Sequence, residues 1–182
     1  MRISAMPMSD RQASLLAALA PQLESIGGRP SPDDVALQGD TGIRLVFSMP
    51  DGAPLEIDFS FVPDMSGEQR YENLQAHAFV HNDFDVGAIT ELLWLVAQVN
   101  RYLPTGSFGV LEDLEMLYWK QNIFVSREVD AAVTAAIITQ QMGVAVRAIS
   151  DYWDTMQQVA SGDLDALSAL RANKWGPVLF GL

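Results

Sequence analysis

The chain of 182 residues has 23 acidic and 11 basic residues, a formal net charge of −12 and an apolar fraction of 49%. This length and apolar fraction suit one well-buried domain, and the charge argues against binding to nucleic acid or to anionic membranes, which requires clustered lysine and arginine. Because the sequence has no cysteine, disulfides, thiolate zinc sites and cysteine nucleophiles are excluded.

Residues 1–8 are expected to form a loose leader. The first twelve residues lack the apolar core of a signal peptide, and no apolar run approaches the roughly 20 residues that span a bilayer. We therefore expect a cytoplasmic protein, without a membrane partner, whose acidic charge keeps it soluble and suits basic partners.

A first helix is predicted over residues 9–26. Ser9 and Gln12 have the spacing of a capping box, in which the serine oxygen accepts a hydrogen bond from a free amide of the first turn. Leucines then recur at helical spacing, and Gly27-Gly28 end the helix. Pro21 removes one backbone bond and should kink or split the helix.

Three antiparallel strands are predicted next, at residues 43–48, 55–61 and 74–80. Apolar and polar residues alternate in them, and a Pro-Asp-Gly turn joins the first two. The preceding connector, 29–41, is expected to hold a short strand at 35–37. One face of the resulting sheet should be solvated and the other covered by helices.

The stretch from Thr90 to Val125 is central to the predicted fold. An amphipathic helix over residues 89–103 is followed by a loop with proline and glycine, and then by two strands at about 108–111 and 116–125. These strands are expected to pair with the upstream three.

A long helix is predicted over residues 127–159, with Ser126 as its N-cap. Its polar stripe changes side near Gly143. Either the helix kinks or breaks there, or its two halves face different environments. The first half is apolar around most of its circumference and should be covered on two sides, by the sheet and by either the C-terminal segment or a second protomer.

After Gly162 a short leucine-rich helix leads to an apolar tail, Trp175–Leu182. So apolar a tail is expected to dock, on its own core or on a partner. The whole pattern predicts an α+β fold of order α-βββ-α-ββ-α, in which an antiparallel sheet of about five strands is packed by helices. The predicted domain covers 9–159, with an added C-terminal helix and tail at 160–182.

His77, His81, Asp83 and Asp85 are the cluster in the sequence that most suggests a metal site. Four residues along a strand span about 13 Å, which is too far for the two histidines to share one ion. A loop site formed by His81, Asp83 and Asp85 stays open beside the simpler interpretation of a solvated acidic turn.

Two carboxylate groups raise the question of acid–base catalysis, which needs pKa values tuned by burial or by a specific partner. Glu56 and Asp58 lie on the predicted solvent face, and Glu112, Asp113 and Glu115 lie at a hairpin. The sequence contains no phosphate-binding loop, dinucleotide-binding motif or nucleophile elbow. We therefore expect neither catalysis nor a cofactor.

Surplus apolar surface points instead to protein–protein contact. Trp94 adds to its apolar neighbours more than one helix face can absorb, and residues 116–119 are apolar on both faces of a strand, which indicates either a sandwiched strand or an interaction edge. Trp153 is assigned to the core. The residues expected to contact a protein partner are Trp94, Leu95, Tyr118, Trp119, Ile138 and Trp175.

The segment LLWLVAQVNRYLPTGSFGVLEDLEMLYWKQNIFVSREVD (92–130) and the region of Trp153 resemble the class I chaperones of type III secretion. They resemble still more closely the YbjN family of bacterial sensory-transduction regulators. Leu92, Leu93, Val96 and Asn100 match a pattern of paired leucines ending in an asparagine. This resemblance implies a homodimer that binds other proteins through sheet edges and apolar grooves, without a cofactor.

We therefore expect a non-enzymatic protein-binding factor, chaperone-like or regulatory, that acts as a homodimer on a protein partner or secreted client. The alternative is a metal-dependent enzyme or metal-binding protein centred on His77, His81, Asp83 and Asp85. A third possibility is a subunit of a larger assembly whose tail docks on a neighbour.

Overall fold

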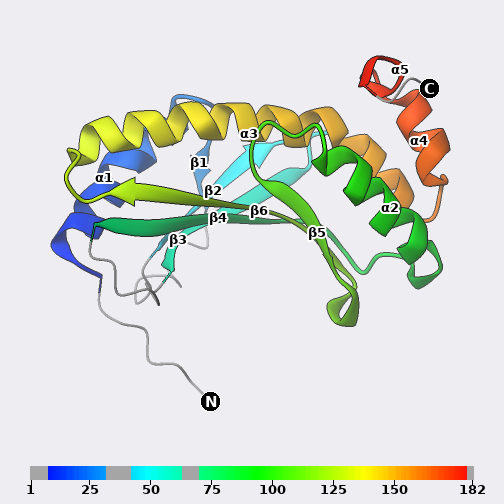
Figure 1. The fold of residues 1–182 in the computed structure, drawn as a ribbon, viewed down its shortest axis with the longest axis horizontal. Coiled ribbons are helices and arrows are strands. Elements are labelled where there is room, and N and C mark those ends of the chain that lie inside the picture. Colours follow the sequence, from blue (N-terminus) through cyan, green and yellow to red (C-terminus); the bar gives the residue numbers. More distant parts are fainter. Residues whose placement is uncertain (1–7, 32–41, 63–69, 180–182) are drawn as a thin grey trace.

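A computed structural model of the chain describes residues 8–31, 42–62 and 70–179. It contains one antiparallel sheet with helices packed on one of its faces (Figure 1), so the predicted α+β class is confirmed. The expected strand at 35–37 and most of the expected leader lie outside the described residues. In chain order the elements are α1 (Asp10–Glu24), β1 (Arg29–Pro30), β2 (Gly42–Ser48), β3 (Pro54–Val62), β4 (Tyr71–Asn82), η2 (Val86–Ala88), α2 (Ile89–Asn100), β5 (Ser107–Leu111), η3 (Glu112–Leu114), β6 (Met116–Ser126), α3 (Ala131–Ala160), α4 (Ala166–Ala172) and α5 (Gly176–Leu179).

The sheet has six strands in the order β1-β2-β3-β4-β6-β5, all antiparallel to their neighbours. All five strands predicted within the described part of the chain are present, and the sixth is the two-residue β1. The longest pairing joins β4 to β6, with a β-bulge between Phe79 and His81. This bulge decides where two histidines point.

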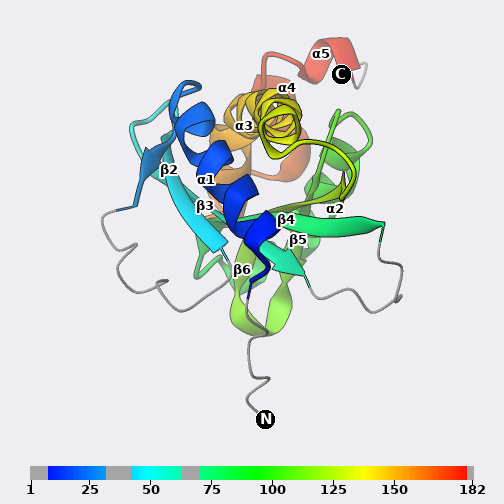
Figure 2. The ribbon, with the colours of Figure 1, turned by 90° about the vertical axis from the view of Figure 1, so that its left-hand side faces the viewer.

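Side-chain alternation divides the sheet into two faces, as expected. In β3 the residues Leu55, Ile57 and Phe59 are fully buried, whereas Glu56 and Asp58 lie on the other face. The helices α1 and α3 lie on the buried side, and none of the described helices covers the opposite side (Figure 2). We call this second side the open face.

The helix α1 begins with the predicted capping box, in which Ser9 and Gln12 bond reciprocally. It continues through Pro21, so the expected split is absent. Pro21 is exposed and lies in the last turn before Glu24, where the lost backbone bond interrupts little of the helix.

The helix α3 runs without a break from Ala131 to Ala160, through Gly143. Of the two predicted alternatives, the structure has the second: the first half lies beside α1, and the second half lies beside α4 (Figure 1). The helix begins four residues later than predicted because Asp130, and not Ser126, caps it by accepting bonds from the amides of residues 132 and 133.

Trp153 is buried, which confirms its assignment to the core. It also fixes α3 to the turn between β2 and β3. Its indole N–H donates to the Asp51 carboxylate at 2.9 Å. That bond is the main reason why the pKa of Asp51 lies below its ordinary value, and an amide from Ala53 acts in the same direction.

The buried carboxylate of Glu72 links three segments that are distant in sequence. It lies on β4 with 4% of its side chain exposed, and the Nε atoms of Arg11 and Arg127 each approach one of its oxygens at 3.5 Å. Arg11 Nε and Glu72 Oε2 form an ion pair without a directed hydrogen bond. Arg11 also donates to the carbonyls of Ser126 and Val129, so α1 is tied to the end of β6.

We expect Glu72→Gln to destabilise the fold by about 3 kcal/mol, because it leaves two guanidinium groups without their buried counter-charge. The free energy of unfolding in urea measures the effect. The matched control is Glu56→Gln on β3, whose carboxylate is 48% exposed beside Arg44 and whose loss should cost under about 0.5 kcal/mol. Equal losses in the two variants would contradict the assigned role of Glu72.

Candidate functional site

The six residues predicted to contact a partner do not form one surface. Trp94 and Trp175 are exposed, by 43% and 38%, and Tyr118 is half-buried on the open face. The other three are corrected: Leu95, Trp119 and Ile138 are buried within the domain and so cannot reach a partner from the folded state.

The correction has a local physical reason at Trp119. This residue faces the helices, and the loop before β5 passes over its indole so closely that a Cβ at Gly106 would lie 2.4 Å from the ring. Gly106 also has a φ of +68°, which glycine adopts without strain. The loop with proline and glycine that was predicted before β5 therefore packs on Trp119.

On α3 the exposed isoleucine is Ile137, one position before the predicted contact residue Ile138. Ile138 is 1% exposed, whereas Ile137 is 50% exposed, because neighbouring helical residues point about 100° apart. Val133 and Val144 are exposed to a similar degree, 53% and 49%. At 100° per residue these three side chains point within about 20° of one direction. We call Val133, Ile137 and Val144 the apolar stripe.

The sheet edge below the first half of α3 has no strand partner among the described residues. β5 pairs only with residues 116–120 of β6, so residues 121–126 of β6 run on beyond it below the first half of α3 (Figure 1). Unpaired edges present a row of free amide and carbonyl groups to other chains.

The direction of the peptide groups along this edge follows from Asn100. Its side chain donates to the Phe108 carbonyl at 2.9 Å and accepts from the Phe108 amide at 2.8 Å, so Phe108 points its peptide groups away from β6. In an antiparallel ladder alternate residues face the same neighbour. The even-numbered residues of β6 therefore face the side of β5, and Asn122 and Phe124 continue that series where β5 has ended.

A groove of about 550 Å³ lies between this edge and α3. Gln121 donates to the Gln141 side chain at 3.3 Å across it. Phe124 lines the groove next to the free edge, and its side chain, which alternation places on the open face with Tyr118, is 73% exposed. We call this groove the edge groove. It is lined by Pro104, Thr105, Gln121, Asn122, Ile123, Phe124, Gln141 and Val144.

The edge groove carries no formal charge. Residues 121–126 and 131–146 contain no aspartate, glutamate, lysine or arginine, although the chain has 34 charged residues, 23 acidic and 11 basic. Its chemistry is confined to free backbone groups, amide and hydroxyl side chains and apolar contact, which suits recognition of a protein strand.

The four residues of the alternative metal hypothesis do not converge. His77 stacks on Tyr118 on the open face, whereas His81 approaches the Gln157 side chain of α3 at 2.5 Å on the opposite face. Asp85 accepts from the Gly87 amide and caps η2. Within the described part of the chain, no three histidine, aspartate or glutamate side chains are placed to hold an ion.

The acid–base candidates lie where the sequence placed them, on exposed surface. Arg44 makes two bonds to Asp58, at 2.5 and 3.0 Å, and lies 3.6 Å from Glu56. Glu112 and Glu115 lie in the turn of η3 between β5 and β6.

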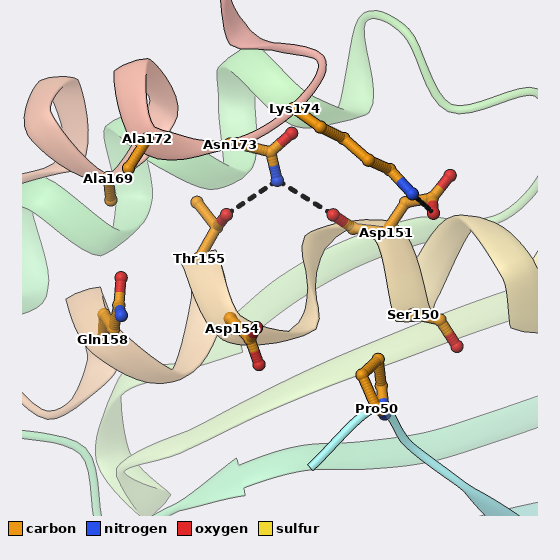
Figure 3. Close-up of a pocket in the computed structure, with 10 residues that line it drawn as sticks. All are labelled: Pro50, Ser150, Asp151, Asp154, Thr155, Gln158, Ala169, Ala172, Asn173 and Lys174. Atoms are coloured by element: carbon orange, nitrogen blue, oxygen red, sulfur yellow. Dashed lines mark hydrogen bonds and ion pairs between the residues drawn. The ribbon is translucent and has the colours of Figure 1, made fainter.

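A second cavity, of about 390 Å³, lies between α3, α4 and the turn after β2 (Figure 3). Asn173 donates to the Thr155 hydroxyl and to the Asp151 carbonyl, both at 2.8 Å. The Asp151 carboxylate pairs with Lys174 and accepts from the Trp175 indole. The tail was predicted to dock either on its own domain or on a partner. Residues 173–175, where it begins, contact their own domain.

An aromatic cluster lies on the open face. The His77 ring stacks on Tyr118 with centroids 5.5 Å apart and meets the Phe79 ring edge-on at 4.7 Å. Burial lowers the pKa of His77 below its ordinary 6.5; Lys120 acts in the same direction and Asp58 opposes it. The neutral imidazole is therefore favoured in the folded protein.

The helix α3 is long and apolar. Within the described residues it is the one helix long and apolar enough to cross a membrane, a test that core helices of globular domains also pass. Here α3 packs on the sheet and on α1, which is the position of a core helix.

Comparison of the chain with protein-family models, with curated proteins and with solved structures finds no significant match. The structure therefore carries the functional inference by itself.

We expect the free energy of unfolding to fall as the pH is lowered from 7.5 through about 6.5, in part because of His77. Its pKa is lower in the folded state, so the unfolded chain binds more protons in this window and stability rises with pH. His77→Gln should make the pH dependence shallower, as measured by urea unfolding at several pH values. An unchanged slope would contradict this.

Asp151→Ala should release the tail, because Lys174 and Trp175 lose their shared acceptor. Trypsin cleavage after Lys174, followed by mass spectrometry, should accelerate at least about fivefold, which corresponds to roughly 1 kcal/mol of local stability. Asp154→Ala, an exposed carboxylate three residues along the same helix, is the control and should leave the rate unchanged. Equal acceleration in both variants would refute the anchoring role.

Proposed function

We propose that this chain is a non-enzymatic protein-binding factor, chaperone-like or regulatory, which acts by contact between chains. The edge groove is the observation that carries the proposal. It joins free peptide groups at Asn122 and Phe124 to Val144 of the apolar stripe, and such a combination supports binding by strand addition. Backbone bonds supply affinity in this mode, and neighbouring apolar contacts supply selectivity.

The rest of the sheet supports a specialised role for this edge. Natural proteins protect sheet edges with proline, very short strands or covering segments. At one end of the sheet the two-residue β1 contains Pro30, and at the other end Asn100 occupies both peptide groups of Phe108. In the described structure, the stretch from Asn122 to Phe124 has no such protection.

The resemblance to the YbjN family and to class I secretion chaperones stays a prediction, and it favours the same function. Those proteins are expected to bind others through edges and apolar grooves. A cytoplasmic homodimer with a protein partner or client is the corresponding proposal for this chain.

A photoreactive benzoylphenylalanine in place of Phe124 tests the proposal in cells that produce the protein. Phe124 lies on the free edge beside the edge groove and its side chain is 73% exposed, so irradiation should give protein adducts, with this chain or another, identified by mass spectrometry. The matched control carries the same group in place of Phe79, exposed by 43% on the open face. Adducts at position 124 no more abundant than those at position 79 would refute binding at the groove.

A further inference from the structure

We propose that a second copy of this chain occupies the edge groove, paired through β6 about a two-fold axis at Ile123. This inference rests on the proposed function and names its partner. It has four independent supports: the pairing of the peptide groups, the position of the apolar stripe, the spacing of the helices and the distribution of charge.

The free edge is complementary to itself. Asn122 and Phe124 both direct their peptide groups outward, so antiparallel pairing of two copies sets Asn122 opposite Phe124 of the second copy, and Phe124 opposite its Asn122. This register makes four backbone hydrogen bonds. Ile123, whose peptide groups face β4, lies on the axis. Beyond Phe124 the Ser126 carbonyl already accepts from Arg11, which limits the free edge to this short stretch.

The apolar stripe is centred on the same axis. The Gln121–Gln141 bond fixes the position of α3 along β6, and the two elements run in opposite directions (Figure 1). Two residues further along β6, about 6.6 Å, correspond to about four residues back along α3. This places Ile137 beside Ile123, so a two-fold axis there brings Ile137 against its own copy.

The spacing between the two copies of α3 suits helix packing. α3 contacts both β4 and β6 and so lies over the boundary between them, about half a strand spacing inside β6. The axis lies about half a strand spacing outside β6. The two helix axes are then about 10 Å apart, near the 8–10 Å at which helices pack.

The distribution of charge favours a second copy as the partner, because two acidic copies can meet only through an uncharged surface. Each copy carries −12, so two copies repel one another wherever acidic surfaces meet. Residues 121–126 and 131–146 contain no charged side chain, and the contact proposed here is built from them. A basic client would instead be bound by an acidic surface.

Two opposite charges at the axis test this arrangement. Ile137→Asp and Ile137→Lys each place like charges against one another, and each should raise the dimer dissociation constant at least about a hundredfold. An equimolar mixture of the two variants should restore the dimer, because opposite charges then meet at the same point. Light scattering after size exclusion measures the mass, and circular dichroism verifies the fold.

The control is Val86→Asp on η2, which is 59% exposed. This helix follows β4, whose last residue Asn82 pairs with Met116, seven residues along β6 from Ile123, so the variant should stay dimeric like the wild type. Hydrogen exchange gives a second readout. The amides of Asn122 and Phe124 should be protected in the wild type and lose protection in Ile137→Asp, while that of Ile123, bonded to β4, stays protected. Salt should leave the wild-type dimer intact or strengthen it, because it screens the repulsion between acidic copies.

The outcomes separate this inference from the proposed function. A wild-type monomer at every attainable concentration, with adducts at position 124 to a different protein, would overturn the second copy and retain a groove that binds a strand of another chain. A wild-type monomer whose adducts at position 124 are no more abundant than those at position 79 would overturn both the second copy and the proposed binding at the groove. A wild-type dimer that the mixed variants fail to restore would overturn the axis at Ile123.

Discussion

The pairing of β4 with β6 is the constraint from which the other parts of the molecule take their positions. It aligns residues 71–82 with residues 116–126 and gives α3 a platform long enough for its first half. β5 covers only the first five residues of β6, and Asn100 holds it against the end of α2. A long central pair beside a short edge strand leaves the rest of β6 unpaired. The edge groove is therefore a result of unequal strand lengths.

The alternating strands and the helices could be predicted because their patterns are local. The strict alternation of β3, the capping box of α1 and the leucines of α2 each determine an element from within about ten residues. The ends of elements were harder to predict where two nearby residues could each form the boundary. Ser126 and Asp130 are both suitable N-caps, but Ser126 is still paired with β4 and the next amide, that of Arg127, donates to the Arg70 carbonyl, so the helix begins only after Asp130.

The site residues could not be predicted because their roles depend on strand order and on one bulge. Residues 116–119 are apolar on both faces, so periodicity could not decide whether Tyr118 or Trp119 faces the helices. His77 and His81 would share a face of a regular strand, and the bulge after Phe79 reverses that. In the sequence Asn122 and Phe124 look like ordinary strand residues. Their peptide groups are free because β5 pairs with β6 only as far as Lys120. The unequal predicted lengths, 108–111 and 116–125, were the one signal available.

The contact between α1 and α3 also constrains how the chain can fold. These helices are separated by more than a hundred residues, and the four longest strands form between them in sequence. High sequence separation between contacting elements slows folding. The apolar side of β3 and β4 stays uncovered until α3 has been synthesised, so the growing chain carries aggregation-prone strands while the residues from 83 to 160 are added. Completion of the core is consequently a late event, in which the two ends of the domain close over a sheet made earlier.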